Sequence, residues 1–107
     1  MVKISDELIN DMKDAIVREV DPEKIILFGS WALGLADEQS DVDFLVIERE
    51  PFGRHRSRRL EAARIWRCLS GFRVPKDILV YSRHELDETP RIVMTALAQG
   101  KVLYESA

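Results

Sequence analysis

Two aspartates separated by one residue, Asp41 and Asp43, are the side chains of this 107-residue chain best suited to chemistry. Side chains on a β-strand alternate between its two faces, so the two carboxylates are expected to project from the same side. Mg²⁺ prefers oxygen ligands and is commonly held by one or two carboxylates together with substrate phosphates and water. The pair therefore predicts a Mg²⁺ site, and the competing interpretation is a polar entry to a strand.

A glycine-serine turn, Gly29 and Ser30, precedes this acid pair by ten intervening residues and follows the apolar run 25–28. Glycine permits a tight turn that a residue with a β-carbon resists. Ser30 stands at or near the first position of a short helical segment, 31–35, whose free backbone N–H groups attract an anion. Beside an acid pair, this turn indicates phosphate binding. Taken alone it is an ordinary turn.

A third acid, Asp77, opens the strand-like run 77–81. Charged side chains are rarely buried without a partner, and a metal held by Asp41 and Asp43 would supply one. Three acids from two neighbouring strands are then expected to bracket two metals, the arrangement that stabilises both the attacking and the leaving oxygens of an in-line phosphoryl displacement. The alternative is that Asp77 lies at a strand edge and faces water.

Helices and strands alternate around these residues. The spacing predicts a first helix that Ser5 caps and Asp21-Pro22 ends. It predicts a later helix with Trp66 in the core and Gly71 as terminator, and a last helix that opens at Pro90 and ends at Gly100. The expected inward faces are Leu8, Met12, Ala15, Ile16 and Val20, then Ala62, Ile65, Trp66 and Leu69, then Val93, Ala96 and Leu97. The expected strands are 24–28, 43–47, 77–81 and 102–104, with one helical turn at 82–86.

Composition places the chain among ordinary globular proteins, with 46% hydrophobic and 33% charged residues. Residues 1–107 are expected to form one domain. The chain lacks an apolar run long enough to span a bilayer, and its first residues lack the apolar core of a signal peptide, so a cytoplasmic location without membrane association is expected. Cys68 cannot pair internally and is interpreted as a small packing residue.

Charge is unevenly distributed. The net charge of −3 disfavours indiscriminate binding to nucleic acid. Basic residues nevertheless crowd one region, where Glu61 opposes Arg54, His55, Arg56, Arg58, Arg59, Arg64 and Arg67. Three interpretations remain open: a solvated helix face, a clamp on a triphosphate or nucleic acid, and a docking patch for an acidic partner.

The run from Gly29-Ser30 to Asp41-x-Asp43, with Asp77 one helix and one strand later, resembles the minimal nucleotidyltransferases (MNT) of the DNA polymerase β superfamily. The likeness covers nearly the whole chain. It implies an α/β (α+β) nucleotidyltransferase fold, a mixed sheet with helices packed against it. It also implies Mg²⁺ bound by Asp41 and Asp43, with Asp77 completing the metal site or activating the acceptor hydroxyl.

Many such small proteins resemble antitoxins that silence a helical HEPN ribonuclease by transferring AMP from ATP to its tyrosine. The resemblance therefore implies ATP as substrate and a HEPN-type toxin as partner. The alternative is an antitoxin with reduced or lost catalysis that neutralises its partner by stoichiometric binding, and a weaker possibility is an RNA or small-molecule acceptor. The oligomeric state stays open between a homo-oligomer and a complex with the partner.

The chain departs from the family at two positions of the turn. The family commonly reads Gly-Ser-Arg-Ala-Arg-Gly, whereas Trp31 and Leu33 stand here at the arginine positions. An arginine bonded to phosphate contributes roughly 1.5 to 3 kcal/mol. Compensation is expected only if the arginines at 54–59 lie on a loop that folds over the site.

Overall fold

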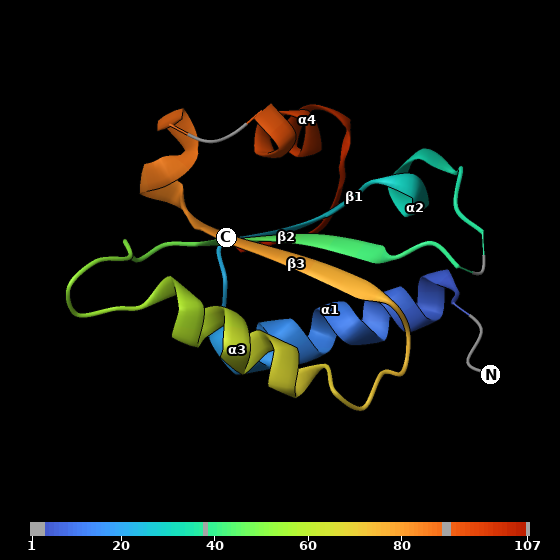
Figure 1. Ribbon diagram of the computed structural model, residues 1–107, viewed down its shortest axis with the longest axis horizontal. Coiled ribbons are helices and arrows are strands. Elements are labelled where there is room, and N and C mark those ends of the chain that lie inside the picture. Colours follow the sequence, from blue (N-terminus) through green and yellow to red (C-terminus); the bar gives the residue numbers. More distant parts are fainter. Residues whose placement is uncertain (1–3, 38, 89–90, 107) are drawn as a thin grey trace.

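A four-stranded mixed sheet separates two helical layers in the computed structural model, which describes residues 4–37, 39–88 and 91–106 (Figure 1). The strand order is β3-β2-β1-β4, in which β2 and β3 run parallel and the other two pairs run antiparallel. The strands are β1 (Lys24–Phe28), β2 (Val42–Glu48), β3 (Lys76–Ser82) and β4 (Lys101–Glu105). The predicted mixed sheet is confirmed, with each later strand one residue longer at both ends than expected.

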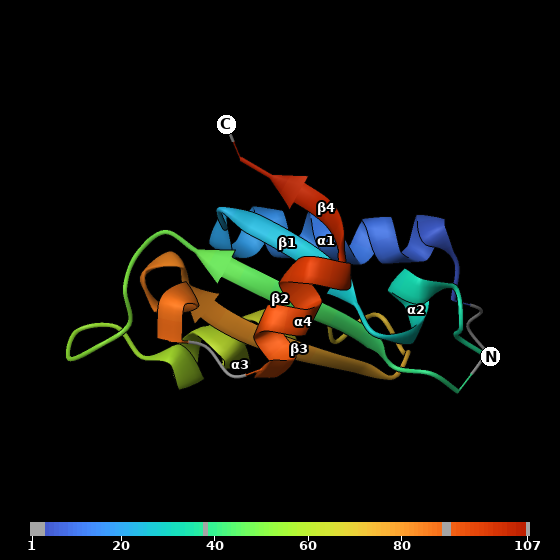
Figure 2. The same ribbon diagram turned by 90° about the horizontal axis from the view of Figure 1, so that it is seen from above.

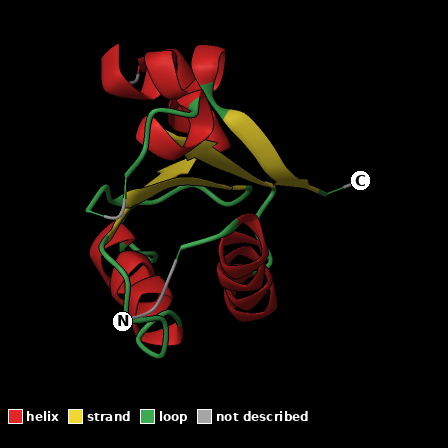
Figure 3. Ribbon diagram, turned by 90° about the vertical axis from the view of Figure 1, so that its right-hand side faces the viewer, coloured by secondary structure: helices red, strands yellow, loops and turns green. Residues whose placement is uncertain are grey.

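The helices α1 (Asp6–Val20) and α3 (Arg58–Cys68) cover one face of the sheet, and α4 (Arg91–Gln99) with the 3-10 helix η1 (Arg83–Glu88) covers the other (Figures 1 and 3). The short α2 (Ser30–Leu33) follows β1 directly. Ser5 caps α1 as predicted, because its hydroxyl accepts the backbone N–H of Leu8 at 3.1 Å. Asp21, with φ of 45°, ends α1 before the proline.

Alternation along β2 divides the core between the two layers. Val42, Phe44 and Val46 belong to the cluster with α1 and α3, whereas Leu45 and Ile47 pack toward α4. Because side chains alternate, Asp43 lies on the same face as Leu45 and Ile47. Asp43 therefore projects to the α4 side, while its neighbours Val42 and Phe44 pack into the core on the opposite face.

Three sequence-based expectations about the helices need correction or fall outside the description. Trp66 is not in the core: its side chain is 40% exposed, with the Lys76 ammonium 5.7 Å from the ring centroid. The helix α3 ends at Cys68 and is capped by Leu69, before Gly71. Pro90 lies outside the described residues, whereas Val93 and Ala96 of α4 are buried as expected. Among the described helices, none has both the length and the apolar character required to cross a bilayer.

Candidate functional site

The sheet places Asp43 and Asp77 side by side. In the parallel β2–β3 pair the two residues are direct partners, and in the antiparallel β1–β2 pair Asp43 lies opposite Phe28, which precedes Gly29. Asp41 immediately precedes β2, two residues from Asp43. Acids from two distant parts of the sequence thus lie at one end of the sheet. Figure 2 shows that β2 begins at the end of the sheet where α2 lies.

Electrostatics reflect this proximity. Partial burial, followed by the charges of Asp77 and Asp41, raises the pKa of the Asp43 carboxyl from 3.8 to about 6. Like charges at short range disfavour ionisation unless a cation lies among them. The three acids therefore interact electrostatically, and ionisation of the Asp43 carboxyl is disfavoured.

Gly29 contacts this group through its backbone. Its φ is +73°, and a β-carbon built on it would lie 2.3 Å from Asp43 Oδ2. Both the backbone conformation and the close approach require glycine here. The turn and the acid are consequently packed as one unit, with Ser30 beginning α2.

Trp31 has a structural role at its position in the turn. Its indole Nε1–H donates to the carbonyl of Ser40 at 3.1 Å, and the ring packs partly against the core. Ser40 and Asp37 are further linked by their own hydrogen bonds. Trp31 thereby holds the chain segment that leads into Asp41, while Leu33 is 50% exposed.

Asp77 differs from the expectation that it is buried and needs a cation partner. It is exposed, and its Oδ1 accepts the backbone N–H of Ile78 at 3.0 Å. Along the described chain no three His, Cys, Asp or Glu side chains are already arranged to hold a metal ion. The donors still fit Mg²⁺ chemically, because hard carboxylate oxygens with mutual repulsion favour such a cation.

A pocket of about 360 Å³ adjoins these residues between the end of β1, α2 and α4. Of the three acids only Asp43 lines it. Sequence reasoning did not single out the contribution of α4, because Thr95 and Gln99 lie beside an inward apolar face and belong to no recognisable motif. The lining consists of Phe28, Gly29, Leu33, Asp43, Thr95, Ala96 and Gln99.

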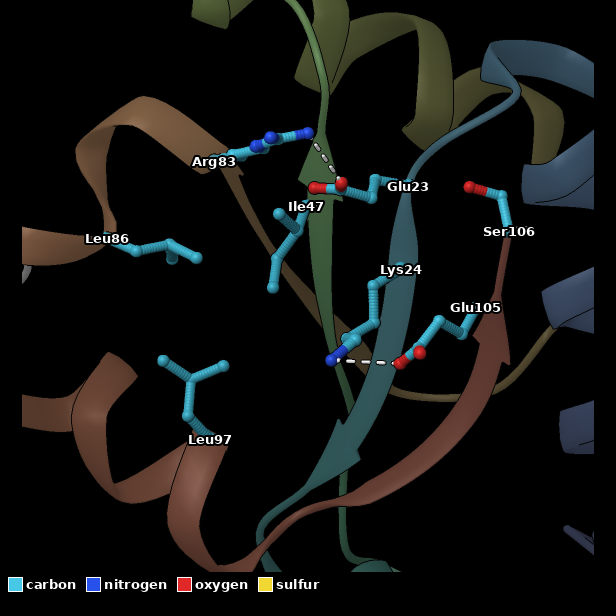
Figure 4. A pocket seen from close by; sticks show the side chains of 8 residues that line it. All are labelled: Glu23, Lys24, Ile47, Arg83, Leu86, Leu97, Glu105 and Ser106. Atoms are coloured by element: carbon cyan, nitrogen blue, oxygen red, sulfur yellow. Dashed lines mark hydrogen bonds and ion pairs between the residues drawn. The ribbon is translucent and has the colours of Figure 1, made fainter.

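A second pocket, of about 330 Å³, lies toward the other end of the sheet and is drawn in Figure 4. Ile47, Leu86 and Leu97 provide apolar walls. The charges around it are paired internally, with Lys24 Nζ 3.0 Å from Glu105 Oε2 and Arg83 Nη1 3.0 Å from Glu23 Oε1. This pairing leaves the pocket without the concentrated charge that a metal–nucleotide complex requires.

The arginine-rich segment lies away from the acids, so the condition for compensation, a loop folded over the site, is not met. Arg56 binds Glu48 at the far end of β2, at 2.7 Å, and Arg58 pairs with Glu85 of η1. Glu48 lies five residues further along the strand than Asp43, which corresponds to about 16 Å. Figure 1 places this loop and α2 at opposite ends of the sheet. No arginine of this loop therefore replaces the two that the turn lacks.

The pairing of Arg56 with Glu48 and Glu61 makes the stability of the protein depend on pH. Arg56 also binds Glu61 at 2.8 Å, so one guanidinium serves two carboxylates. Burial, and then the neighbouring Glu61, raise the pKa of Glu48 from 4.5 to about 8 despite Arg56. The folded state holds a proton here that the unfolded state releases, so stability is lost as pH rises through about 8.

We therefore expect Glu48→Gln to gain stability relative to the wild type as the pH is raised from 6 to 9, because the amide cannot ionise. Thermal melts across this interval measure the difference. Glu50→Gln, at an exposed acid two residues further on, is the matched control and should leave the pH profile unchanged. Parallel profiles for Glu48→Gln and the wild type would contradict a proton held at Glu48.

Solved structures share this fold. A chain in a toxin–antitoxin complex with AMP-PNP superimposes with a TM-score of 0.61 at 21% identity, covering 91% of this chain and 73% of that one. A putative nucleotidyltransferase from Sulfolobus solfataricus has a TM-score of 0.58 at 18% identity, covering 92% and 78%. A chain in the complex of tri-AMPylated Shewanella oneidensis HEPN toxin with MNT antitoxin has a TM-score of 0.58 at 17% identity, covering 94% and 72%. At these identities the likeness establishes the fold, which is that of a nucleotidyltransferase.

The sequence itself establishes the family. The family model described as a nucleotidyltransferase domain matches residues 9–103, which include all three acids and the Gly-Ser turn. The chain belongs to this family. No curated protein matches it.

Proposed function

We propose that the protein transfers AMP from ATP to a hydroxyl group of a partner protein, a tyrosine of a HEPN-type toxin, and so acts as an antitoxin. The observation that carries the proposal is the register that sets Asp77 beside Asp43, next to the Gly29 turn, in a chain of the nucleotidyltransferase family. Neighbours whose structures hold AMP-PNP or an AMPylated toxin support the choice of nucleotide and partner.

Each residue has a role in this proposal. Backbone N–H groups at Gly29 and Ser30 orient the β and γ phosphates, and Asp41 and Asp43 hold Mg²⁺. When bound, the metal neutralises charge that develops on the phosphate oxygens. Asp77, an exposed residue of the edge strand β3, accepts the proton of the acceptor hydroxyl.

The atoms balance in one displacement. The acceptor oxygen forms a bond to the α phosphorus, and the bond from that phosphorus to the oxygen bridging the α and β phosphates breaks. Pyrophosphate leaves with the bonding electrons. The products are an AMP ester of the acceptor, pyrophosphate and a proton held first on Asp77.

Incubation of the protein with a HEPN-type partner and ATP labelled at either the α or the γ phosphate tests this reaction. We expect the α label on the partner and the γ label in pyrophosphate. Label from the γ position on the partner would indicate phosphoryl transfer and contradict the proposal, as would the absence of both labels at millimolar Mg-ATP.

A second candidate is an antitoxin that acts by binding alone. Exposed apolar side chains next to the site favour it, since Leu33 is 50% and Leu35 is 75% exposed. Calorimetric titration separates the two: heat on adding Mg-ATP is expected for the enzyme. Tight partner binding without any heat from nucleotide would favour the binding protein.

A further inference from the structure

We propose that the pocket between β1, α2 and α4 binds the base of the nucleotide, and that Gln99 selects adenine over guanine there. This inference rests on the proposed function and identifies which part of the substrate each wall of the site contacts. It concerns α4, which contains no residue of the acid pair or of the Gly-Ser turn.

The walls of the pocket away from Gly29 and Asp43 do not suit a triphosphate. Phe28, Leu33 and Ala96 provide apolar surface, and Asp43 is the one charged residue among the described residues that line it. A triphosphate requires cations, whereas this lining offers an aromatic ring, aliphatic groups and two uncharged polar side chains. Its volume of about 360 Å³ lies in the range of small-molecule sites, roughly 300 to 1,000 Å³. An uncharged planar group suits these walls.

The position of the pocket matches the layout of a bound nucleotide. Asp43 and Gly29 line it, and the proposed function places the metal and the phosphates at these two residues. Thr95 and Gln99 of α4 line it as well. A nucleotide whose phosphates lie at the turn can therefore extend its ribose and base toward α4.

Gln99 carries the selective chemistry. Residues four apart on a helix share a face, so Thr95 and Gln99 present their polar groups together. The glutamine amide contains both donors and an acceptor, and it pairs in a bidentate manner with N6 and N7 of adenine. Guanine has an acceptor, O6, at the place of the N6 donor and cannot form the same pair.

Replacement of Gln99 by Leu tests this assignment, because leucine has a similar size and no hydrogen-bonding group. Binding of Mg-ATP and Mg-GTP is measured by calorimetry, and transfer to the partner is measured with both nucleotides. The preference for ATP over GTP is expected to fall about 10-fold. Met94→Leu, at a 54% exposed position of the same helix outside the pocket, is the matched control and should keep the wild-type preference.

The outcomes separate the two proposals. If the wild type binds and transfers AMP but Gln99→Leu keeps the wild-type preference, the base assignment is overturned and the transfer reaction stands. If the wild type binds neither nucleotide, the proposed function fails and the base assignment with it. Gln99 is exposed, so the variant is expected to fold, which circular dichroism verifies.

Discussion

Asp43→Asn is expected to abolish AMP transfer while making the metal-free protein more stable. The asparagine side chain would keep the size of the aspartate but lose the charge that holds Mg²⁺. Because electrostatic stabilisation by a metal amounts to several kcal/mol, transfer should fall at least about 100-fold. Stability should rise because the pKa of Asp43 is already raised to about 6 by burial, Asp77 and Asp41, so its ionised form is a cost at neutral pH.

Melting temperatures with and without Mg-ATP measure the stability and the binding of the metal–nucleotide complex, and α-labelled ATP with the partner measures transfer. Without ligand the variant should melt at a higher temperature than the wild type. Saturating Mg-ATP should raise the melting temperature of the wild type alone, because a ligand stabilises only the protein that binds it. Asp11→Asn, at an exposed acid of α1, is the control and should change neither quantity. Full activity in the Asp43 variant would remove that residue from the mechanism.

Gly29→Ala is expected to lose activity by displacing the acid rather than by deleting it. The added β-carbon would lie 2.3 Å from Asp43 Oδ2 and 3.3 Å from its Cγ, so the carboxylate must rotate away. The φ of +73° adds a backbone cost of about 1 to 3 kcal/mol. We expect a drop in AMP transfer of at least about 100-fold, since a misplaced metal ligand forfeits the same stabilisation, together with a lower melting temperature.

Gly34→Ala tests whether a positive φ alone, without contact with Asp43, causes the loss of activity. Gly34 has nearly the same φ, +72°, but nothing lies within 4 Å of a β-carbon built on it. Gly29 has a ψ of −155°, in a region essentially restricted to glycine, whereas Gly34 has a ψ of 19°, in the left-handed region. Gly34→Ala should therefore lose less stability than Gly29→Ala and keep its transfer activity. Equal activity losses would show that backbone strain, and not the contact with Asp43, is responsible.

The sheet could be predicted from the sequence because local patterns encode it. Apolar runs between turn residues define the strands, and alternation in β2 places Asp43 and Leu45 on the same face. The resemblance supplied the mixed sheet, which the parallel and antiparallel pairings confirm. The reasoning on the acids supplied the neighbouring strands, which the register of Asp43 with Asp77 confirms. Cap chemistry likewise located both ends of α1 from Ser5 and Asp21.

Features that depend on side-chain packing could not be predicted in this way. Periodicity assigns Trp66 to an inward face, but Ile65 and Leu69 fill that space and Trp66 lies 40% exposed. Counting charges left the role of the arginines at 54–59 open, and the structure shows that Arg56 pairs with the buried Glu48 at the other end of β2. The pocket wall on α4 arises only when the helix packs on β1, far from it in sequence.

The most direct test of the account is a crystal structure of the protein with Mn²⁺ and AMP-PNP. The anomalous signal of manganese locates the ion independently of the protein model. The account predicts the ion between Asp41 and Asp43, phosphate oxygens against the backbone of Gly29 and Ser30, and the base beside Gln99. Manganese bound away from these carboxylates, or phosphates in the pocket near Lys24 and Arg83, would contradict it.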